Sequence, residues 1–540
     1  KLPVIKGELQ HHARGCYSEC TFIKKGNRQC ENNVLAAERF CLMANRLTGI
    51  RYPEKKLKKA WKNILMNQFH DILGGCAIKK AYEDAAYLYG EVMSITEQEI
   101  HYALQSIAQK IDTLQGRKLP GREQISPSCK VGTPDRWMLW ETDGIGTPLV
   151  VFNPHTRTVR MPVEVNCIAA KVTDEQGMEI PFQQVRAPFT NGDKDRMQTC
   201  FVAEVQPLGY RVYRLFTKRQ DEVSFPSEFL VTPHTMENSR IWVEWDTQTG
   251  DICRIYDKQK GYMILDGSCR AVVLDETQAD TWAHGKVTLG ETEGCFQNPQ
   301  FSILETGAVR AVLRVTSYWK ESVLQRDYVL ETGSDSVKVH VKVDFRQENR
   351  TLKFAFPAKE KEVTAQIPFG SVRREKGTGE EPCGNWIAAG KLGIANDGKY
   401  GYDTTDKEVR LTILRTAAYA DHFAVRDDFC EIMDYGMHEC SYELFPYTGN
   451  AKAQQTADEF NFGLRAVSTG FHSGNLPESD SCYQSQAEHI VVTAIKKSED
   501  DEETVVRFYE ADGQKEETKL NDYFLNERDM INGLDIDNRK

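Results

Sequence analysis

The chain has 540 residues, a length that exceeds one ordinary core of roughly 100 to 200 residues, so we expect two or three domains. With 40% hydrophobic and 27% charged residues, and no apolar run near the roughly 20 residues of a membrane span, it has the composition of a globular protein without a membrane segment. The net charge of -11 argues against nucleic acid and anionic lipid as partners, because both require a basic face.

The chain contains 15 cysteines, an odd number without regular spacing. This usage favours reduced thiols over a disulfide scaffold, and we therefore expect a cytoplasmic location. The first residue is Lys1 rather than methionine, and the opening KLPVIKGELQ lacks the charged head and apolar stretch of a signal peptide. We expect the chain to begin inside a larger protein.

Between residues 30 and 112 the apolar side chains recur with helical spacing. The first predicted helix ends at Gly49, which suits a left-handed cap, and its apolar face carries Val34, Ala37, Phe40 and Met43. The last predicted helix runs from about Ile78 to Ile111. Because the connections are short, we expect an antiparallel three-helix bundle at residues 30–115.

The middle helix of this bundle contains the stretch NQFHDILGGC. We predict that it starts at Pro53 and ends at Gly74-Gly75, with an inward stripe formed by Leu57, Trp61, Ile64, Leu65, Phe69 and Ile72. At about 100° per residue, His70 falls roughly 160° from the middle of that stripe. His70 is therefore expected to point away from the bundle core, as a functional or an ordinary exposed residue.

The outward face of the same helix changes composition along its length. Its early turns carry four lysines, and its later turns carry none, as the two sets show: Lys55, Lys56, Lys59 and Lys62, then Asn63, Met66, Asn67 and His70. Water does not require this change, so we expect another domain to cover the later turns. An imidazole beside the Asp71 carboxylate would suit a metal or sugar site there.

After a linker predicted at residues 116–147, the period of the apolar pattern changes from 3.6 to 2. Alternation is clearest in SVKVHVKVDF, and WDTQTGDICRIYD is typical of a strand, turn and strand. The region 148–540 shows no long helical stretch and is predicted to form stacked antiparallel β-sandwiches. The acidic stretch Ser498–Glu503 is expected at a hairpin tip. The predicted fold class is multidomain α+β.

Several segments in chain order resemble the glycoside hydrolase family 38 α-mannosidases. They are GELQHHARGCYS, KKGNRQCEN, AAERF, NQFHDIL, LVVFNP, NDGKYGYD, LTILRTA and DYGMHECSYELFPY. The resemblance implies a seven-stranded α/β barrel, a three-helix bundle and a series of β-sandwiches, with residues 1–29 as the end of the barrel. It also implies the retaining, exo-acting hydrolysis of α-mannosides or mannose-containing glycans with one zinc ion, a reaction that needs two carboxyl groups about 5 Å apart.

The resemblance assigns roles to individual residues. His70 matches a zinc-ligand histidine of the family, and Asp71 matches the aspartate that hydrogen-bonds the mannose hydroxyls. His12, Arg14, Asp434 and His438 are expected to line the same cleft as substrate-binding residues. From pattern alone, His12 could equally be an exposed loop residue, Arg14 a surface ion pair and His438 a buried strand residue.

The chain departs from the family pattern in one respect. The family's early histidine-x-aspartate motif, its nucleophile and its acid/base lie before GELQ, and the chain has no histidine two positions before an aspartate. Since zinc normally takes four ligands, these residues hold half of a site, and we expect the chain alone to be inactive.

Two alternatives come from the residues themselves. One is a noncatalytic carbohydrate-binding or structural module that uses exposed aromatic rings, with the candidates Trp282, Trp319 and Trp386. The other is a structural zinc site built from His11, His12, Cys16 and Cys20, whose spacing matches no standard finger. A homo-oligomer is expected only on general grounds, because symmetric assembly is common among large enzymes.

Overall fold

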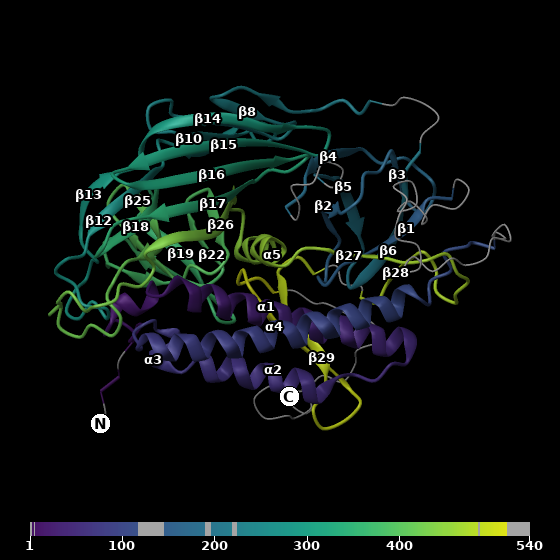
Figure 1. Cartoon of the computed structure of the whole chain (residues 1–540), viewed down its shortest axis with the longest axis horizontal. Coiled ribbons are helices and arrows are strands. Elements are labelled where there is room, and N and C mark those ends of the chain that lie inside the picture. Colours follow the sequence, from purple (N-terminus) through teal and green to yellow (C-terminus); the bar gives the residue numbers. More distant parts are fainter. Residues whose placement is uncertain are drawn as a thin grey trace.

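The computed structural model describes residues 3–4, 6–116, 145–188, 196–218, 224–483 and 487–515. Most of the predicted linker at 116–147 lies outside the described residues. The helices of the N-terminal region lie together along one side of the molecule and most of the strands lie on the other (Figure 1), which confirms the multidomain α+β fold class. Among the described residues, no helix has the length and apolar character needed to cross a bilayer.

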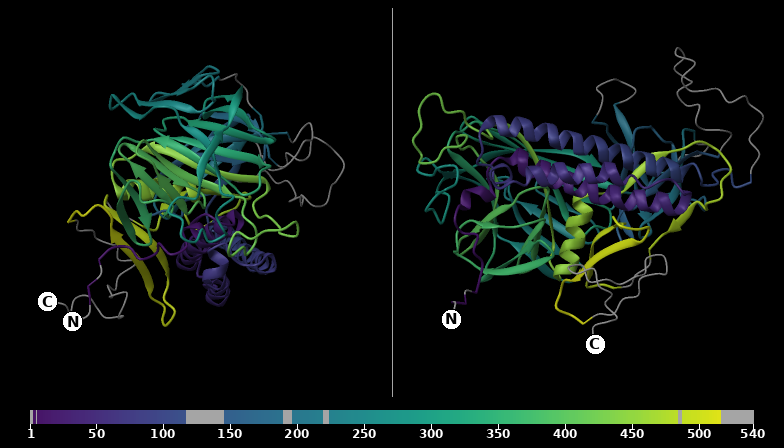
Figure 2. Two further views of the ribbon diagram at one scale, coloured as in Figure 1. Left: turned by 90° about the vertical axis from the view of Figure 1, so that its left-hand side faces the viewer. Right: turned by 90° about the horizontal axis from the view of Figure 1, so that it is seen from below.

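The helical region contains two long helices, α1 (Thr21–Thr48) and α4 (Lys79–Ala108), with α2 (Glu54–Asn67) beside them. They run side by side below the sheets (Figure 2). Their shared core includes Ile23, Val34, Phe40, Ile64, Val92 and Ile107, all fully buried. The predicted cap is confirmed, because Gly49 has φ 75° and its N–H donates to the Asn45 carbonyl.

The prediction of a continuous middle helix through His70 is wrong. Helix α2 ends at Asn67, Phe69 is extended (φ -52°, ψ 137°), and His70 begins a separate short helix, α3 (His70–Leu73). Polar contacts hold the chain at the break: the Gln68 amide donates to Asn27 Oδ1 and Glu31 Oε1 on α1. These tertiary bonds outweigh the weak preference for continuing the helix.

The predicted inward stripe is also partly wrong. Leu65 and Phe69 are 60% and 51% exposed, while Asn67, predicted outward, is fully buried and donates to the Ala85 carbonyl on α4. The buried stripe is instead formed by Leu57, Ala60, Ile64 and Asn67. A polar residue replaces an apolar one in this stripe because its hydrogen bond compensates for burial. On the face expected to be covered by another domain, Met66 is 61% exposed, and that covering domain stays a prediction.

The largest β-region is built on a nine-stranded antiparallel sheet. Its order is β14 (Gln297–Thr306), β15 (Arg310–Trp319), β16 (Ser322–Glu331), β17 (Val337–Phe345), β26 (Gly436–Pro446), β23 (Leu392–Asn396), β22 (Trp386–Ala389), β19 (Glu362–Ile367) and β20 (Gly370–Glu375). The alternation predicted for SVKVHVKVDF is confirmed in β17, where Val337, Val339, Val341 and Val343 are buried.

Two smaller sheets share a core with the nine-stranded sheet. One has the order β13 (Glu291–Cys295), β12 (Arg270–Asp275), β18 (Arg350–Pro357), β25 (Glu408–Arg415), β24 (Gly401–Thr404) and β21 (Glu381–Pro382). The other has the order β11 (Tyr262–Asp266), β10 (Ile252–Asp257), β9 (Ile241–Trp245), β8 (Thr235–Glu237) and β7 (Leu230–Val231). The predicted WDTQTGDICRIYD hairpin is confirmed as β9 and β10.

A second, smaller sandwich lies beside the far end of the bundle. One sheet contains β27 (Arg465–Ser468), β1 (Thr147–Phe152), β6 (Gly209–Phe216), β28 (Ser479–Ser481) and β3 (Lys171–Thr173), and the other contains β2 (Val159–Val165), β5 (Met197–Val205) and β4 (Phe182–Arg186). Leu149 and Val151 of β1 face this sandwich, whereas Val150 and Phe152 join the helical core. Both faces of β1 are covered, which explains its continuous apolar sequence.

The C-terminal region contains a helix that the sequence analysis did not predict. Helix α5 (Asn450–Asn461) packs Ala453 and Ala457 against Trp386 and Phe445 of the nine-stranded sheet. Its apolar face is built from alanines, so the hydrophobic signal is weak. The last hairpin, β29 (Ile490–Lys497) and β30 (Thr504–Glu510), lies against α1, and the acidic stretch Ser498–Glu503 forms its tip as predicted.

Candidate functional site

The His70 imidazole lies at the start of α3 with 79% of its side chain exposed. Its contacts are local: the Phe69 ring centroid is 4.3 Å away and the Asp71 Oδ1 atom is 3.7 Å from Nε2. Asp71 is 48% exposed. Both side chains are therefore accessible, and neither makes a close ion pair within the described residues. An imidazole and a carboxylate held in this way can each bind an external group.

The turn after α3 is packed tightly against the loop that precedes α1. At Gly75, which has φ +85°, an added Cβ would lie 2.4 Å from the Cβ of Glu19. The Lys24 amine joins the two segments because it donates to the Glu19 carbonyl at 2.5 Å and to the Leu73 carbonyl at 3.1 Å. The Tyr82 hydroxyl accepts from the Ala77 N–H at 2.7 Å. These contacts fix the position of the α3 backbone, from which the two polar side chains project.

Behind this loop lies a buried cluster of charges that the residue-by-residue assignment missed. The fully buried Arg415 guanidinium forms ion pairs with Glu19 and Glu276, and its Nη1 donates to the Gly15 carbonyl at 3.0 Å. Burial raises the pKa of Glu19. An arginine inside the strand-like stretch LTILRTA was the available signal, since a buried cation requires partners.

His12 and Arg14 lie on the same loop in different environments. His12 is exposed, and its ring meets the His284 ring edge-on at 5.9 Å between centroids. The Arg14 side chain is 11% exposed, and its Nη1 donates to the carbonyls of Thr378 and Glu380 at 2.7 and 2.8 Å. Arg14 thus clamps the loop to the segment before β21. Substrate binding by either residue stays a prediction.

Asp434 and His438 do come together, at the N-terminus of α1. Asp434 has φ +54°, and its carboxylate accepts from the Thr21 N–H at 2.8 Å and from the Thr21 hydroxyl at 3.0 Å. His438, half-buried on β26, lies with Nε2 2.8 Å from the Asp434 carbonyl, to which it donates. The carboxylate therefore accepts a hydrogen bond from the first N–H of α1, and its negative charge interacts favourably with the helix dipole. Their predicted role toward substrate stays a prediction.

The residues at this site supply only part of a zinc-binding set. Within the described residues, no three His, Cys, Asp or Glu side chains are grouped as metal ligands. His11 pairs with Glu381, and Cys20 is buried, so the structural-zinc alternative at His11, His12, Cys16 and Cys20 is not supported. The exposed His70 imidazole fits a zinc ligand, yet the described residues supply only part of the usual four-ligand set.

The three tryptophans proposed for glycan contact differ in exposure. Trp386 is 1% exposed and donates to Gln454, and Trp319 packs on the large core beneath the Lys320 amine. Trp282 is half-buried and stacks on the His422 ring at 4.6 Å between centroids. Only Trp282 of the three therefore lies in an aromatic surface cluster, which continues through His284 and Phe423.

A hollow of about 1090 Å³ lies between α1, α2, the β19–β22 region and the β29–β30 hairpin. Leu73 of α3 and Gln68 lie on its wall, so it reaches the neighbourhood of the candidate site. Its lining also includes Arg28, which is 3% exposed, stacks over Tyr400, and has no hydrogen-bond partner at Nη1. The hollow has the volume of a typical ligand cleft.

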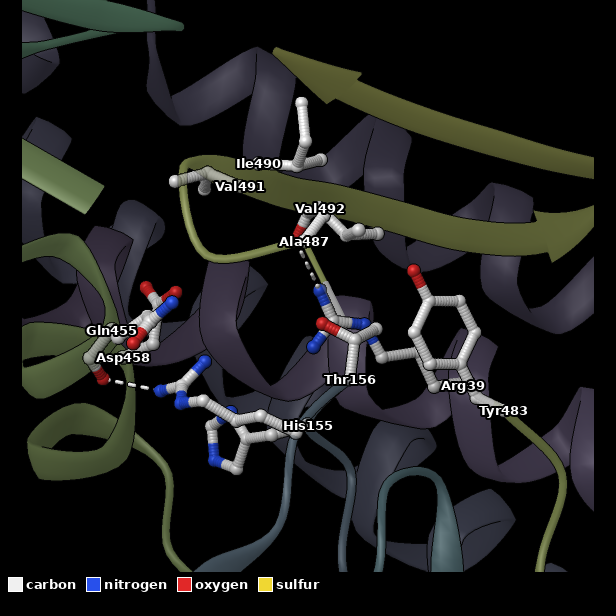
Figure 3. Close-up of a pocket in the computed structure, with 11 residues that line it drawn as sticks. Arg39, His155, Thr156, Gln455, Asp458, Tyr483, Ala487, Ile490, Val491 and Val492 are labelled. Carbon is white, nitrogen blue, oxygen red and sulfur yellow. Dashed lines mark hydrogen bonds between the residues drawn. The ribbon is translucent and has the colours of Figure 1, made fainter. Parts of the chain in front are cut away.

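A separate cavity of about 50 Å³ lies where α1, α5 and β29 meet (Figure 3). Arg39 donates from here to the carbonyls of Val492 and Thr493, and burial lowers the pKa of His155 to about 3. A neutral His155 donates from Nε2 to the Phe462 carbonyl at 2.7 Å. The cavity is too small for a sugar and serves as a structural junction.

Comparisons with known proteins place this architecture in one class, the glycosyl hydrolases. The alpha mannosidase middle domain matches residues 11–107, the glycosyl hydrolases family 38 C-terminal domain matches residues 236–423, and the family 38 C-terminal beta sandwich domain matches residues 489–531. Together these matches cover more than half of the chain. The chain belongs to glycoside hydrolase family 38, of which it carries the middle and C-terminal domains.

Curated relatives and solved structures agree with this assignment. The chain is 22% identical to alpha-mannosidase G of Dictyostelium discoideum, over 95% of this chain and 48% of the relative, and 24% identical to alpha-mannosidase 2C1 of Mus musculus, over 92% and 44%. A family 38 crystal structure from Enterococcus faecalis has the same fold, with a TM-score of 0.77 at 17% identity, over 96% of this chain and 67% of that one. The chain thus spans about half the length of the curated relatives it matches.

Proposed function

We propose that this chain forms part of a retaining, zinc-dependent, exo-acting α-mannosidase that hydrolyses α-mannosides or mannose-containing glycans. The observation that carries the proposal is the exposed His70–Asp71 pair at the start of an anchored short helix, in a chain that belongs to family 38. The curated relatives are themselves named alpha-mannosidases, which supports the substrate class. The fourteen free cysteines of the described residues support the further proposal of a cytoplasmic location.

In the proposed mechanism, a bound zinc ion supplies a Lewis acid that holds and polarises the sugar hydroxyls. His70 offers an imidazole nitrogen as one of its ligands. Asp71 accepts hydrogen bonds from hydroxyls of the terminal mannose and so orients the ring. The contacts of Lys24 and Gly75 keep α3 in place, so that the backbone that carries both side chains does not have to be ordered during binding.

The described residues give no second histidine or aspartate grouped with His70 in a three-ligand set. We therefore propose that the other zinc ligands, the nucleophile and the acid/base come from outside these 540 residues, and that this chain alone does not turn over. The two catalytic carboxyl groups would lie about 5 Å apart, as retention requires.

The test measures zinc content and aryl α-mannoside hydrolysis for this chain and for the protein extended upstream. We expect one zinc and turnover only in the extended form, with loss of both on His70→Ala and a loss of at least about 100-fold in kcat/KM on Asp71→Asn. His101→Ala, which removes another exposed helical histidine, is the control. An extended protein that keeps zinc and activity after His70→Ala would contradict the assignment.

A second candidate function is noncatalytic binding of glycans, favoured by the stacked Trp282 cluster. A half-exposed indole can pack against the apolar face of a pyranose. Calorimetric titration of this chain with a mannose oligosaccharide tests it, with Trp282→Ala compared with Trp319→Ala. Binding lost only in Trp282→Ala, together with an inert extended protein, would favour the binding module over the enzyme.

A further inference from the structure

Two cysteines meet at the contact between the loop before α1 and the turn after α3. An added Cβ at Gly74 would lie 3.4 Å from the Cys76 sulfur and 3.6 Å from the Cys16 Cβ, so both residues face the same point. Cys16 comes from the loop and Cys76 from the turn, sixty positions apart in the chain.

The two thiols differ in exposure and acidity. Cys16 is half-buried, whereas Cys76 is 3% exposed. Hydrogen bonding by the Cys76 thiol, together with the nearby Lys24 charge, lowers the pKa of Cys16 to about 7 despite its partial burial. The same hydrogen bond and burial raise the pKa of Cys76. Among the described thiols whose pKa is shifted, Cys16 is the one shifted downward.

We propose that Cys16 and Cys76 form a reversible disulfide site that links the loop before α1 to the turn after α3. A partly exposed nucleophilic thiol backed by a buried thiol is the arrangement that thiol–disulfide exchange requires. This inference rests on the geometry of the two cysteines and does not depend on the proposed hydrolase function.

The chemical step uses a low-molecular-weight disulfide, such as oxidised glutathione, as the oxidant. The Cys16 thiolate attacks one sulfur of that disulfide, and one glutathione thiolate leaves and takes up a proton. The Cys76 thiol then loses its proton to solvent, and its sulfur attacks the Cys16 sulfur and expels the second glutathione. In total, two protein thiols are oxidised, one small disulfide is reduced, and two glutathione thiols are formed.

The linkage would act on the candidate site next to it. The Cys76 sulfur lies 3.7 Å from the Asp71 carbonyl and 3.9 Å from its Oδ1 atom, so its single proton is within reach of Asp71 as well as Cys16. A disulfide has no such proton, so oxidation leaves the Asp71 oxygens without this donor. It also replaces a non-covalent contact between loop and turn with a bond of about 2.05 Å.

The experiment equilibrates this chain at pH 7 with mixtures of reduced and oxidised glutathione, traps free thiols by alkylation in acid, and maps disulfides by mass spectrometry. We expect a Cys16–Cys76 linked peptide that accumulates with oxidised glutathione and disappears on reduction. Cys76→Ser should stop at a stable glutathione adduct on Cys16, and Cys16→Ser should form neither product. Cys430→Ser, which removes an exposed cysteine elsewhere, is the matched control and should leave the linkage unchanged.

A second measurement needs no variant. Alkylation of the unmodified chain at pH 7 should label Cys16 about fivefold faster than Cys430, with a rate that rises through pH 7. Absence of the linked peptide in fully oxidised glutathione, or labelling of Cys16 no faster than Cys430, would overturn the proposal. If Cys76→Ser fails to fold, the linked peptide and the alkylation rates of the unmodified chain still decide it.

Discussion

The loop before α1 and helix α3 lie against each other, yet the charged groups of the loop are buried and paired, whereas those of α3 are exposed. On the loop side, Glu19 is fully buried and paired with the buried Arg415. On the α3 side, His70 and Asp71 are exposed and 3.7 Å apart, without a close ion pair. Buried charges must be paired to be tolerated, so the first set serves structure. The second set is held in place by its neighbours and keeps its bonding capacity for another molecule.

The largest effect on stability is expected from a substitution in the buried charge cluster around Arg415. Arg415→Met removes the partner of two buried carboxylates, Glu19 and Glu276, and should lower the free energy of unfolding by about 3–5 kcal/mol. Urea unfolding measures it. Arg254→Met is the control, because Arg254 is 53% exposed and its pair with Glu244 contributes about 0–1 kcal/mol. Equal effects of the two substitutions would show that Glu19 and Glu276 are not held by Arg415.

The second effect concerns the pH dependence of stability caused by the buried His155, which lines the small cavity of Figure 3. Burial lowers the pKa of His155 to about 3, so the folded state keeps it neutral while the unfolded chain titrates near 6.5. Below pH 6.5 only the unfolded state takes up this proton, and stability falls by about 1.4 kcal/mol per pH unit toward pH 3. His155→Gln should remove this part of the slope, measured by urea unfolding between pH 7 and 4.5.

The control for this titration is His101→Gln on the exposed face of α4, which should leave the slope unchanged. Above pH 7 His155→Gln should show no dependence on pH that differs from that of the unmodified chain, because the imidazole is then neutral in both states. A slope that survives His155→Gln would assign the acid sensitivity to carboxylates elsewhere.

How far the sequence predicts this molecule depends on whether local or distant contacts decide each feature. The part of α1 from about residue 30 to its Gly49 cap, and the alternation of β17, were predicted from apolar periodicity and a capping glycine, whereas the start of α1 at Thr21 was not. The break before His70 was not, since it depends on bonds from Gln68 to α1. Helix α5 was missed because its buried face consists of alanines, whose apolar signal is weak.

The candidate site divides in the same way. His70 and Asp71 were identified by resemblance to a family motif, and the exposure of His70 agrees with the predicted outward direction, although the helix that carries it is not continuous. The role of Arg415 and the contact between Cys16 and Cys76 depend on segments that meet only after folding. No spacing rule connects residues that are 60 or 400 positions apart.

A smaller effect is expected where the two segments touch. Gly75→Ala places a Cβ 2.4 Å from Glu19 at φ +85°, and should destabilise the protein by about 1–3 kcal/mol. Gly90→Ala is the matched control in the interior of α4, where the added methyl meets open space, and should stabilise by about 0.5–1 kcal/mol. Thermal unfolding of both variants should therefore give shifts of opposite sign. Shifts of the same sign would contradict the tight packing of the turn on the loop.

The smallest effect is expected at the exposed pair itself. His70→Ala removes a side chain that is 79% exposed, and should change the free energy of unfolding by less than about 0.5 kcal/mol. Since Arg415→Met is expected to cost several times more, the comparison separates a residue kept for structure from one kept for binding. A loss above about 2 kcal/mol on His70→Ala would mean that the imidazole supports the fold. A neutral result leaves the backbone that carries it held by the contacts of Gly75 and Lys24, so that a ligand meets an imidazole on an anchored helix.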